Sequence, residues 1–256
     1  MVKLLTKVFD GGLFMKTGIY TITENKLLTK GVYRMILEGD TSDITASGQF
    51  VNIKLTGKFL RRPISVYDYN DQTVTIIYKV VGEGTEQMSK MVPGEKLDVM
   101  TGLGNGYDLS KSGDRPLLIG GGVGVPPMYN LCKKLIAEGK KPTMIMGFNT
   151  KEEIFCFDEF SALCDTVVTT VDGSFGIKGF VTDAMKDIDY TYYYTCGPEP
   201  MLKAISSVSK TCGQLSFEER MGCGFGACMG CSCKTKYGNK RICKDGPVLE
   251  SEEVIW

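Results

Sequence analysis

Four cysteines close to the C-terminus have the spacing of iron ligands. Cys223, Cys228, Cys231 and Cys243 follow the pattern C-x4-C-x2-C-x11-C, which is the spacing at which plant-type loops hold a [2Fe–2S] cluster. The residues between the first three are small or flexible, so the backbone can bend around two bridged irons and direct amide N–H groups at the sulfurs. The pattern therefore predicts a centre that carries one electron at a time.

Zinc is the alternative ligand for these cysteines. Structural zinc favours two separated C-x2-C pairs, often with histidine, whereas only Cys228 and Cys231 have that spacing and the chain contains no histidine. Cys233 lies two residues beyond a ligand, and we expect a buried neighbour there because the set of four is complete without it. Iron–sulfur ligation is the favoured interpretation.

A second candidate site is a glycine turn. The apolar run 116–119 ends in the glycine-rich stretch 120–127, after which apolar residues recur at helical spacing. Such a turn lets a pyrophosphate approach the backbone, although the strict G-x-G-x-x-G order is not met and a glycine cluster can be only a tight connection. The stretch 195–198 follows later and favours a nucleotide site, to which we assign Gly120, Gly121, Gly122, Gly124, Pro126, Cys196, Gly197 and Pro198.

A third candidate site begins with a basic residue at the end of an apolar run. The sequence Arg62-Pro63-Ile64-Ser65 is compatible with an edge strand, where proline is tolerated and arginine is solvated. It also suits a flavin, because arginine pairs with a pyrophosphate and the serine hydroxyl can bond near the reactive edge of the ring. Gly84 and Thr85 follow the next strand and can offer backbone N–H groups to the same phosphates. The motifs together favour flavin.

The predicted secondary structure around these residues changes along the chain. Short extended runs over 17–108 predict a small antiparallel barrel, and alternating strand and helix patterns over 115–212 predict a parallel sheet covered on both faces. The polar stretch 111–114 is the candidate linker. The expected fold is mixed: an antiparallel β-barrel FAD domain (1–112, with 1–16 as an extension of unassigned role), an α/β parallel-sheet nucleotide-binding domain (113–212) and a small C-terminal [2Fe–2S] domain (213–256).

Composition limits the partners. Lys+Arg and Asp+Glu both total 30, so no charge excess recommends a nucleic acid or an anionic membrane. No apolar run approaches the ~18 residues of a membrane span, and the N-terminus lacks the pattern of a secretory signal. We expect a cytoplasmic protein whose six further cysteines are mostly buried thiols.

The motifs occur in the order seen in the ferredoxin–NADP reductase superfamily, whose barrel binds FAD and whose α/β domain binds a nicotinamide nucleotide. The stretches 102–107 and 218–231 also resemble the electron-transfer subunits of NAD-dependent (type B) dihydroorotate dehydrogenases. The resemblance implies catalytic roles for Ser65 and Cys196 and FAD contacts from Arg62, Pro63, Ile64, Ser65, Ile77, Tyr78, Lys79, Gly84 and Thr85.

In that family, electrons pass from a separate FMN-containing subunit through [2Fe–2S] and FAD to NAD+, and the resemblance implies such a partner, in a heterotetramer with two copies of each subunit. Two alternatives stay open. One is another NAD(P)H-dependent flavin and iron–sulfur reductase of the superfamily, with a ferredoxin, sulfide or hydrogenase partner. The other is a non-enzymatic zinc protein.

One departure from the superfamily bears on the nucleotide. Asn149 stands where many NADP-using relatives carry arginine, which leaves a 2′-phosphate without an evident partner and favours NAD. Lys151 could substitute for the arginine. Trp256 ends the chain after the cysteine-rich loop, so we expect it to anchor packing rather than to cover a flavin.

Overall fold

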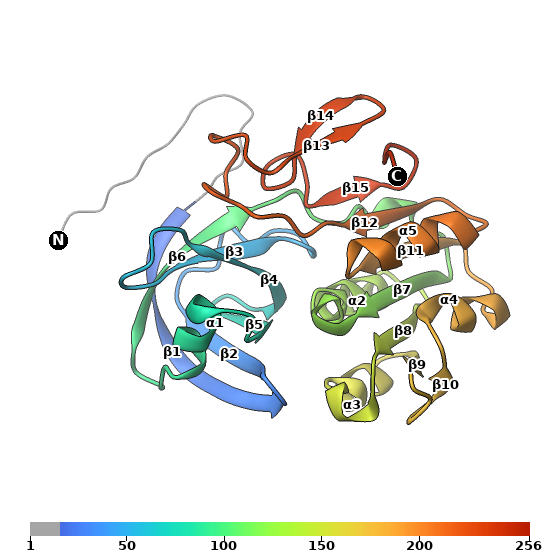
Figure 1. The fold of residues 1–256 in the computed structure, drawn as a ribbon, viewed down its shortest axis with the longest axis horizontal. Coiled ribbons are helices and arrows are strands. Elements are labelled where there is room, and N and C mark those ends of the chain that lie inside the picture. Colours follow the sequence, from blue (N-terminus) through green and yellow to red (C-terminus); the bar gives the residue numbers. More distant parts are fainter. Residues whose placement is uncertain (1–15) are drawn as a thin grey trace.

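The structure is a computed structural model that describes residues 16–256. The N-terminal extension expected over 1–16 therefore lies, except for Lys16, outside the described residues. Three parts follow one another along the chain: a barrel, an α/β layer beside it, and a C-terminal segment that lies across the top of both in Figure 1. The mixed fold expected from the sequence is confirmed.

Six antiparallel strands close the barrel in the order β1-β2-β5-β4-β3-β6. The strands are β1 (Lys16–Thr29), β2 (Val32–Glu38), β3 (Phe50–Lys54), β4 (Arg62–Tyr69), β5 (Thr73–Lys79) and β6 (Lys96–Leu103), and the short helix α1 (Glu83–Ser89) follows β5. Closure leaves these strands without a free edge, which suits a small antiparallel sheet.

Side chains on β3 alternate between the barrel core and its outer face, as the pleat of a strand requires. Val51 and Ile53 pack in the core with β2, β4 and β5 residues. Phe50 instead packs among residues of the α/β layer and the C-terminal segment, and Asn52, two positions on, shares its side of the strand. The outer face of β3 is therefore covered by other parts of the chain.

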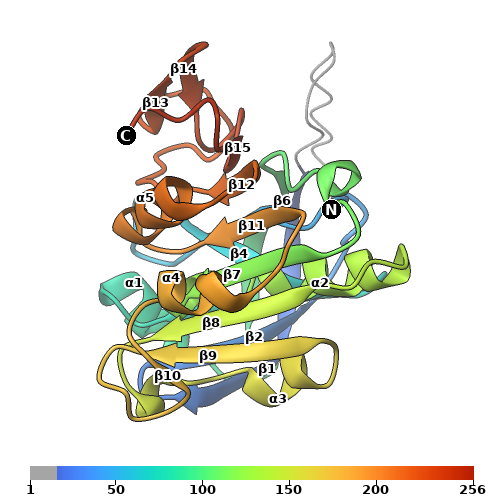
Figure 2. The same cartoon turned by 90° about the vertical axis from the view of Figure 1, so that its right-hand side faces the viewer.

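The α/β layer is a seven-stranded sheet with the order β10-β9-β8-β7-β11-β12-β15, parallel except where β15 pairs with β12. Figure 2 shows this sheet from the side away from the barrel. Its strands are β7 (Pro116–Gly121), β8 (Thr143–Phe148), β9 (Asp165–Thr170), β10 (Ile177–Lys178), β11 (Tyr192–Cys196), β12 (Gly213–Ser216) and β15 (Val248–Glu250). Its helices are α2 (Met128–Ala137), α3 (Phe157–Ser161), α4 (Val181–Ala184) and α5 (Glu199–Val208).

Helices cover both faces of the sheet, as expected from the alternating pattern. Residues of α2 and α3 pack in the cluster that faces the barrel, and residues of α4 and α5 pack on the other face. Barrel and sheet are held by α2 against β4, where the Tyr67 and Tyr129 rings stack 4.4 Å apart. Asn130 adds a hydrogen bond from its Nδ2 to Asp68 Oδ1 at 2.8 Å.

The seven-stranded sheet crosses the boundary expected between the second and third domains. Both β12 and β15 lie inside the range 213–256 but are strands of the seven-stranded sheet. The remainder forms the cysteine loop and the two-stranded hairpin β13 (Ser232–Thr235) with β14 (Gly238–Arg241). This segment is too small to build its own core, so strands at both ends anchor it to the sheet.

No helix within residues 16–256 is long and apolar enough to cross a membrane.

Candidate functional site

The structure brings the four predicted ligand cysteines together as two pairs. The Cys228 main-chain N–H donates to Cys223 Sγ at 3.4 Å, and the Cys243 main-chain N–H donates to Cys231 Sγ at 3.4 Å. Across residues 16–256, no three side chains of metal-binding type converge on a single point. Two pairs of thiols suit a bridged two-iron unit, in which each iron takes two of them.

Backbone amides surround these sulfurs. The N–H of Gly226 donates to Cys243 Sγ at 3.1 Å and that of Ala227 donates to Cys223 Sγ at 3.2 Å. Such donors stabilise negative charge on sulfur. Burial raises the pKa of the Cys223 thiol, but amide donors led by the N–H groups of Cys228 and Phe225 outweigh it and hold this pKa down at about 6. Burial instead raises the pKa of the Cys243 thiol to about 12. Because cysteine binds a metal as the thiolate, binding of the positively charged irons would have to displace the Cys243 proton. The donor set and its amides fit a [2Fe–2S] cluster.

The four predicted ligand cysteines differ in their solvent exposure. Cys231 and Cys243 are buried in the core shared with the barrel, whereas Cys228 is exposed. Beside Cys228 stand Phe225 and Met229, which are large apolar residues with 38% and 54% of their surface exposed. One edge of the cysteine loop therefore faces the protein interior and the other faces outward.

The predicted flavin residues Arg62 and Gly84 meet. A Cβ atom on Gly84 would lie 2.1 Å from Arg62 Nε, so only glycine lets the guanidinium lie against this turn. The Thr85 Oγ1 accepts hydrogen bonds from the Val81 and Gly82 amides at 2.9 and 3.3 Å, which shapes the turn from inside. A guanidinium held over a turn is a fitting cradle for the FAD pyrophosphate.

The other predicted flavin residues lie on the two strands that lead to this turn. Pro63 and Ser65 occupy the outer face of β4, since Ile64 packs against the barrel core. Tyr78 is also in that core, where its hydroxyl donates to Asn25 Oδ1 at 3.0 Å. Contacts of Ile64 and Tyr78 with a flavin would therefore come from their main chains. Ile77 packs toward the α/β layer and Lys79 is exposed.

The predicted nucleotide residues gather where the strand order reverses. Strands β8 to β10 extend from β7 in one direction and β11 lies on its other side, and ligands of open α/β sheets bind at the carboxyl ends of such strands. Those ends carry the glycine turn and Cys196. A Cβ atom on Gly124 would lie 2.1 Å from the Cys196 carbonyl oxygen, so the two loops touch.

Packing accounts for most of these glycines. Side chains added at Gly120, Gly121 and Gly197 would strike Val125 or Met201, whereas Gly122 has a φ of +52° and nothing within 4 Å of its Cβ position. A tight strand-to-helix connection, without a bound nucleotide, is therefore enough to explain these close contacts. The open backbone at Gly122 is the part that fits a nucleotide.

A cavity of about 380 Å³ adjoins the nucleotide residues. Gly197 and Pro198 line it on one side, and Cys233 and Trp256 line it on the other. The Trp256 ring packs against Phe217 at 5.9 Å. Cys233 therefore faces this cavity from β13.

Cys196, the predicted catalytic thiol, has a nearby acidic residue, Glu218, that sequence reasoning did not select as a site residue. Burial raises the pKa of Cys196 to about 12, and the nearby charge of Glu218 adds to that rise. Glu218 lines the cavity of about 380 Å³, and desolvation raises the pKa of its carboxyl, although the residue as a whole is exposed. The Cys196 thiol is therefore protonated at neutral pH.

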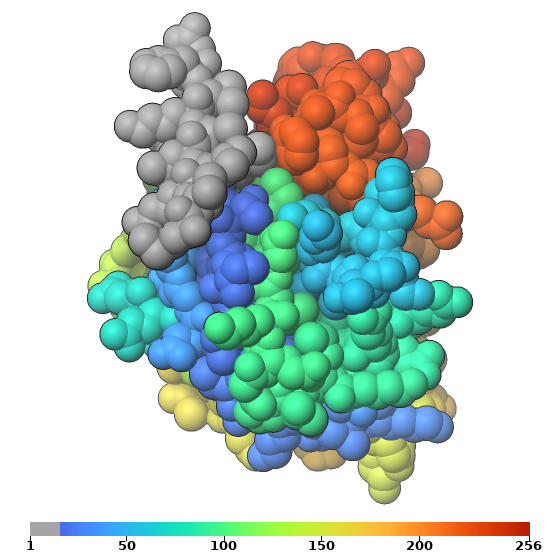
Figure 3. Space-filling view, turned by 90° about the vertical axis from the view of Figure 1, so that its left-hand side faces the viewer, coloured from blue at the N-terminus to red at the C-terminus, as the bar shows by residue number. Residues whose placement is uncertain are grey.

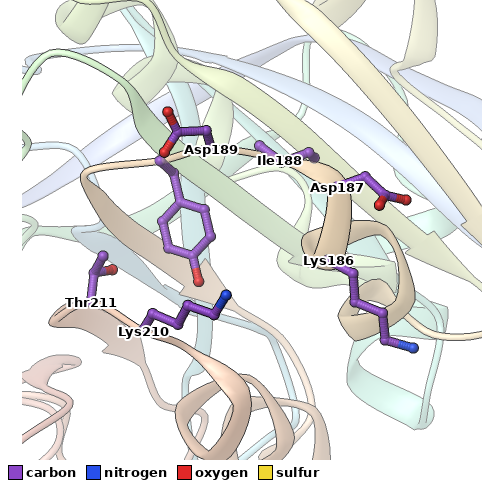
Figure 4. Close-up of a pocket in the computed structure, with 7 residues that line it drawn as sticks. Lys186, Asp187, Ile188, Asp189, Lys210 and Thr211 are labelled. Carbon is purple, nitrogen blue, oxygen red and sulfur yellow. The ribbon is translucent and has the colours of Figure 1, made fainter.

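A second cavity, of about 370 Å³, is separate from these sites (Figure 4). It contains none of the predicted cofactor residues; its lining is Lys186, Asp187, Ile188, Asp189, Tyr190, Lys210 and Thr211.

Asn149 follows β8, as expected, and has an acidic neighbour that sequence reasoning missed. The Glu153 carboxylate accepts two hydrogen bonds from Asn149, one from its side-chain Nδ2 at 3.0 Å and one from its main-chain N–H at 3.2 Å. An acidic group after the second strand suits the hydroxyls of an NAD ribose and repels a 2′-phosphate. The signal available in the sequence was that Glu153 follows Asn149 by four residues.

Two protein-family models match the chain. The iron–sulfur cluster binding domain of dihydroorotate dehydrogenase B matches residues 218–255, and the oxidoreductase NAD-binding domain matches residues 118–207. The first range contains all four predicted ligand cysteines.

Curated relatives match almost the full length. Proteins from Geobacillus sp. (strain WCH70) and Fusobacterium nucleatum subsp. nucleatum are 43% and 44% identical, each over 94% of this chain and 99% of their own. A Bacillus pumilus protein is 43% identical over 94% and 98%. All three are named dihydroorotate dehydrogenase B (NAD(+)), electron transfer subunit.

Solved structures share the fold. An NADH-dependent reduced ferredoxin–NADP oxidoreductase superposes with a TM-score of 0.86 at 30% identity, over 93% of this chain and 90% of the other. A ferredoxin reductase of carbazole 1,9a-dioxygenase gives 0.66 at 19% identity, over 75% and 64%. The latter shows likeness of fold alone.

Proposed function

The chain belongs to the family of electron-transfer subunits of NAD-dependent dihydroorotate dehydrogenases, and we propose that it carries electrons from a catalytic partner subunit to NAD+ in pyrimidine biosynthesis. The partner oxidises dihydroorotate to orotate, which releases two electrons and two protons. NAD+ takes up both electrons with one proton as a hydride, and the other proton goes to solvent.

The cofactors divide this work by their chemistry. An iron–sulfur cluster handles single electrons and nicotinamide handles hydride, so a flavin that does both connects them. Cys223, Cys228, Cys231 and Cys243 would hold the cluster, Arg62 with Gly84 would hold the FAD pyrophosphate, and the turn at Gly122 would receive the nucleotide. Ser65 and Cys196 are the proposed catalytic residues beside the flavin and the nicotinamide.

The observation that carries the proposal is the contact between the cysteine loop and the flavin-site strands. Gly224 of the loop lies against Asn52 of β3, and β3 pairs with β4, which bears Arg62 and Ser65. A short path between an iron–sulfur centre and a flavin is what electron transfer requires. A zinc-binding interaction module has no need of that proximity.

The partner is proposed to be an FMN-containing subunit, in a heterotetramer with two copies of each chain in the cytoplasm. The outward edge of the cysteine loop supports docking there. Cys228, Phe225 and Met229 are exposed on it, and an apolar surface beside a redox centre suits a protein partner. No second flavin barrel is present in residues 16–256, so the pyrimidine chemistry would lie on the partner.

Reconstitution tests the proposal. The purified chain should oxidise NADH with a dye but should not oxidise dihydroorotate. Adding the FMN subunit from the same organism should create NAD+-dependent orotate formation, monitored as orotate and NADH together. If the two proteins bind, all cofactors are loaded and no coupled turnover appears, the chain is instead a reductase for another partner, such as ferredoxin.

A further inference from the structure

A buried amide near the cysteine loop has no partner. Asn52 is fully buried, and within residues 16–256 neither its Nδ2 nor its Oδ1 makes a hydrogen bond. Its register neighbours are Pro63 on β4 and Met100 on β6, whose side chains offer at most a weak thioether acceptor. Leaving a buried amide unpaired destabilises a fold, so the position calls for a ligand.

The amide is directed at the cysteine loop. A Cβ atom on Gly224 would lie 2.4 Å from Asn52 Nδ2, so the absence of a side chain at Gly224 lets the amide reach the loop next to Cys223. Gly224 also has a φ of +83°, which favours glycine. In Figure 3 the C-terminal segment, in orange, lies directly above the barrel strands of this region, in cyan.

The strand holds Asn52 in place. Arg61 Nη1 donates to the main-chain oxygens of Asn52 and Asp98, at 3.3 and 3.1 Å, and thereby ties β3 to β6. Phe50, on the same side of β3, packs in the core that contains Cys231 and Cys243. The strand thus presents one side-chain amide to the cysteine loop at Gly224, next to Cys223.

The sulfurs of an iron–sulfur centre, including those of its cysteine ligands, accept hydrogen bonds. The cysteine sulfurs of this loop accept them from backbone amides of the loop itself. We propose that Asn52 is a positioning residue whose Nδ2–H group donates a hydrogen bond to a sulfur of the [2Fe–2S] centre and raises its reduction potential. Hydrogen bonds to sulfur favour the reduced, more negative cluster. The inference deepens the proposed function and rests on it.

Redox titration followed by electron-spin resonance tests this role. Asn52→Leu removes the donor, and Asn52→Asp keeps the size but replaces the donor with a carboxylate. Each change should lower the equilibrium constant for cluster reduction about tenfold, which is about 59 mV for a one-electron couple. Met100→Leu is the matched control, because it alters the neighbouring buried side chain without touching the amide, and it should leave the potential unchanged.

If both variants lose iron, their potentials cannot be compared. The role of Asn52 is then tested by pulsed electron-spin resonance of the wild-type protein labelled with ¹⁵N-asparagine. A labelled nitrogen coupled to the reduced cluster is expected, and its absence overturns the role of Asn52. An unshifted cluster potential in variants with full iron content also overturns it, and a shift in the flavin potential alone would assign the amide to FAD. If the wild-type protein shows no [2Fe–2S] signal, the proposed function fails first.

Discussion

Arg62 illustrates how a single side chain depends on a distant glycine. Its guanidinium lies over Gly84, where a Cβ atom would be 2.1 Å from Nε, and it donates to the Leu60 carbonyl oxygen at 2.5 Å. Held this way, it can pair with a pyrophosphate without first being ordered, so less side-chain entropy is lost on binding.

Arg62→Ala should therefore weaken FAD retention about tenfold or more, because a charge-assisted hydrogen bond contributes roughly 1.5–3 kcal/mol. The measurement is the FAD dissociation constant of the purified variant, from flavin fluorescence on dilution. Arg115→Ala is the control, since Arg115 pairs with Asp189 on the exposed surface. Equal retention in both variants would show that Arg62 is only a surface arginine.

The cysteine assignment is tested by comparing two neighbours on the same loop. Cys231→Ser should remove or weaken the [2Fe–2S] absorbance and spin signal, because Cys231 Sγ is paired with Cys243 and accepts the Cys243 amide at 3.4 Å. Cys233→Ser should preserve both signals, since Cys233 lines the cavity beside Trp256. Iron per chain is the readout, and equal loss from both changes would mean that the ligand frame is shifted.

At the scale of an element, we expect the loop after β8 to govern which nucleotide is accepted. Asn149 and Glu153 are joined by two hydrogen bonds, and we expect the Glu153 carboxylate to disfavour a 2′-phosphate, which pairs best with a cation. Neither residue alone accounts for this arrangement; the turn that brings position i+4 back to position i produces it.

The wild-type chain should prefer NADH to NADPH. Asn149→Arg combined with Glu153→Gln should raise kcat/KM for NADPH about tenfold or more, because a repulsive charge is replaced by a charge-assisted bond of roughly 1.5–3 kcal/mol. Dye reduction measures both nucleotides without the partner subunit. Glu152→Gln is the control, since Glu152 is an exposed neighbour. A wild-type preference for NADPH would overturn the assignment.

At the scale of the whole molecule, we expect the cysteine segment to depend on its neighbours and on iron for its fold. It contains a hairpin of two four-residue strands, and its buried residues Cys231, Ile242 and Cys243 belong to a core built mainly by the barrel and the sheet. Strands β12 and β15 fix its two ends to the sheet.

Removing iron with a chelator should therefore loosen the segment between β12 and β15 while the rest of the chain stays folded. Faster hydrogen exchange is expected there, together with tryptic cleavage near Lys234 and Lys240, which lie on the hairpin. Exchange in β7 and β8 should not change, and FAD should stay bound. Unchanged protection of the hairpin after complete iron loss would show that packing alone maintains it.

Local signals in the sequence determined much of this protein. The cysteine spacing, the alternating runs of the barrel and the strand–glycine–helix pattern are short-range features, because ligand loops and periodic strands are encoded within a few residues. They predicted the barrel and the parallel sheet, which the structure confirms, and the residues assigned to each cofactor, which stay predictions. The sheet extends past the boundary expected at 212/213, because pairing of β12 with β11 and β15 is set by distant strands.

The tertiary structure alone decided which of these residues meet. Arg62 and Gly84 lie 22 positions apart, and Asn52 touches Gly224 from another part of the fold. Nothing in the run Phe50–Lys54 distinguishes Asn52 from a polar residue on an ordinary strand. Its unpaired amide becomes visible only when barrel closure and the return of the C-terminal segment bury it, because hydrogen-bond satisfaction is a property of packed surfaces and not of local sequence.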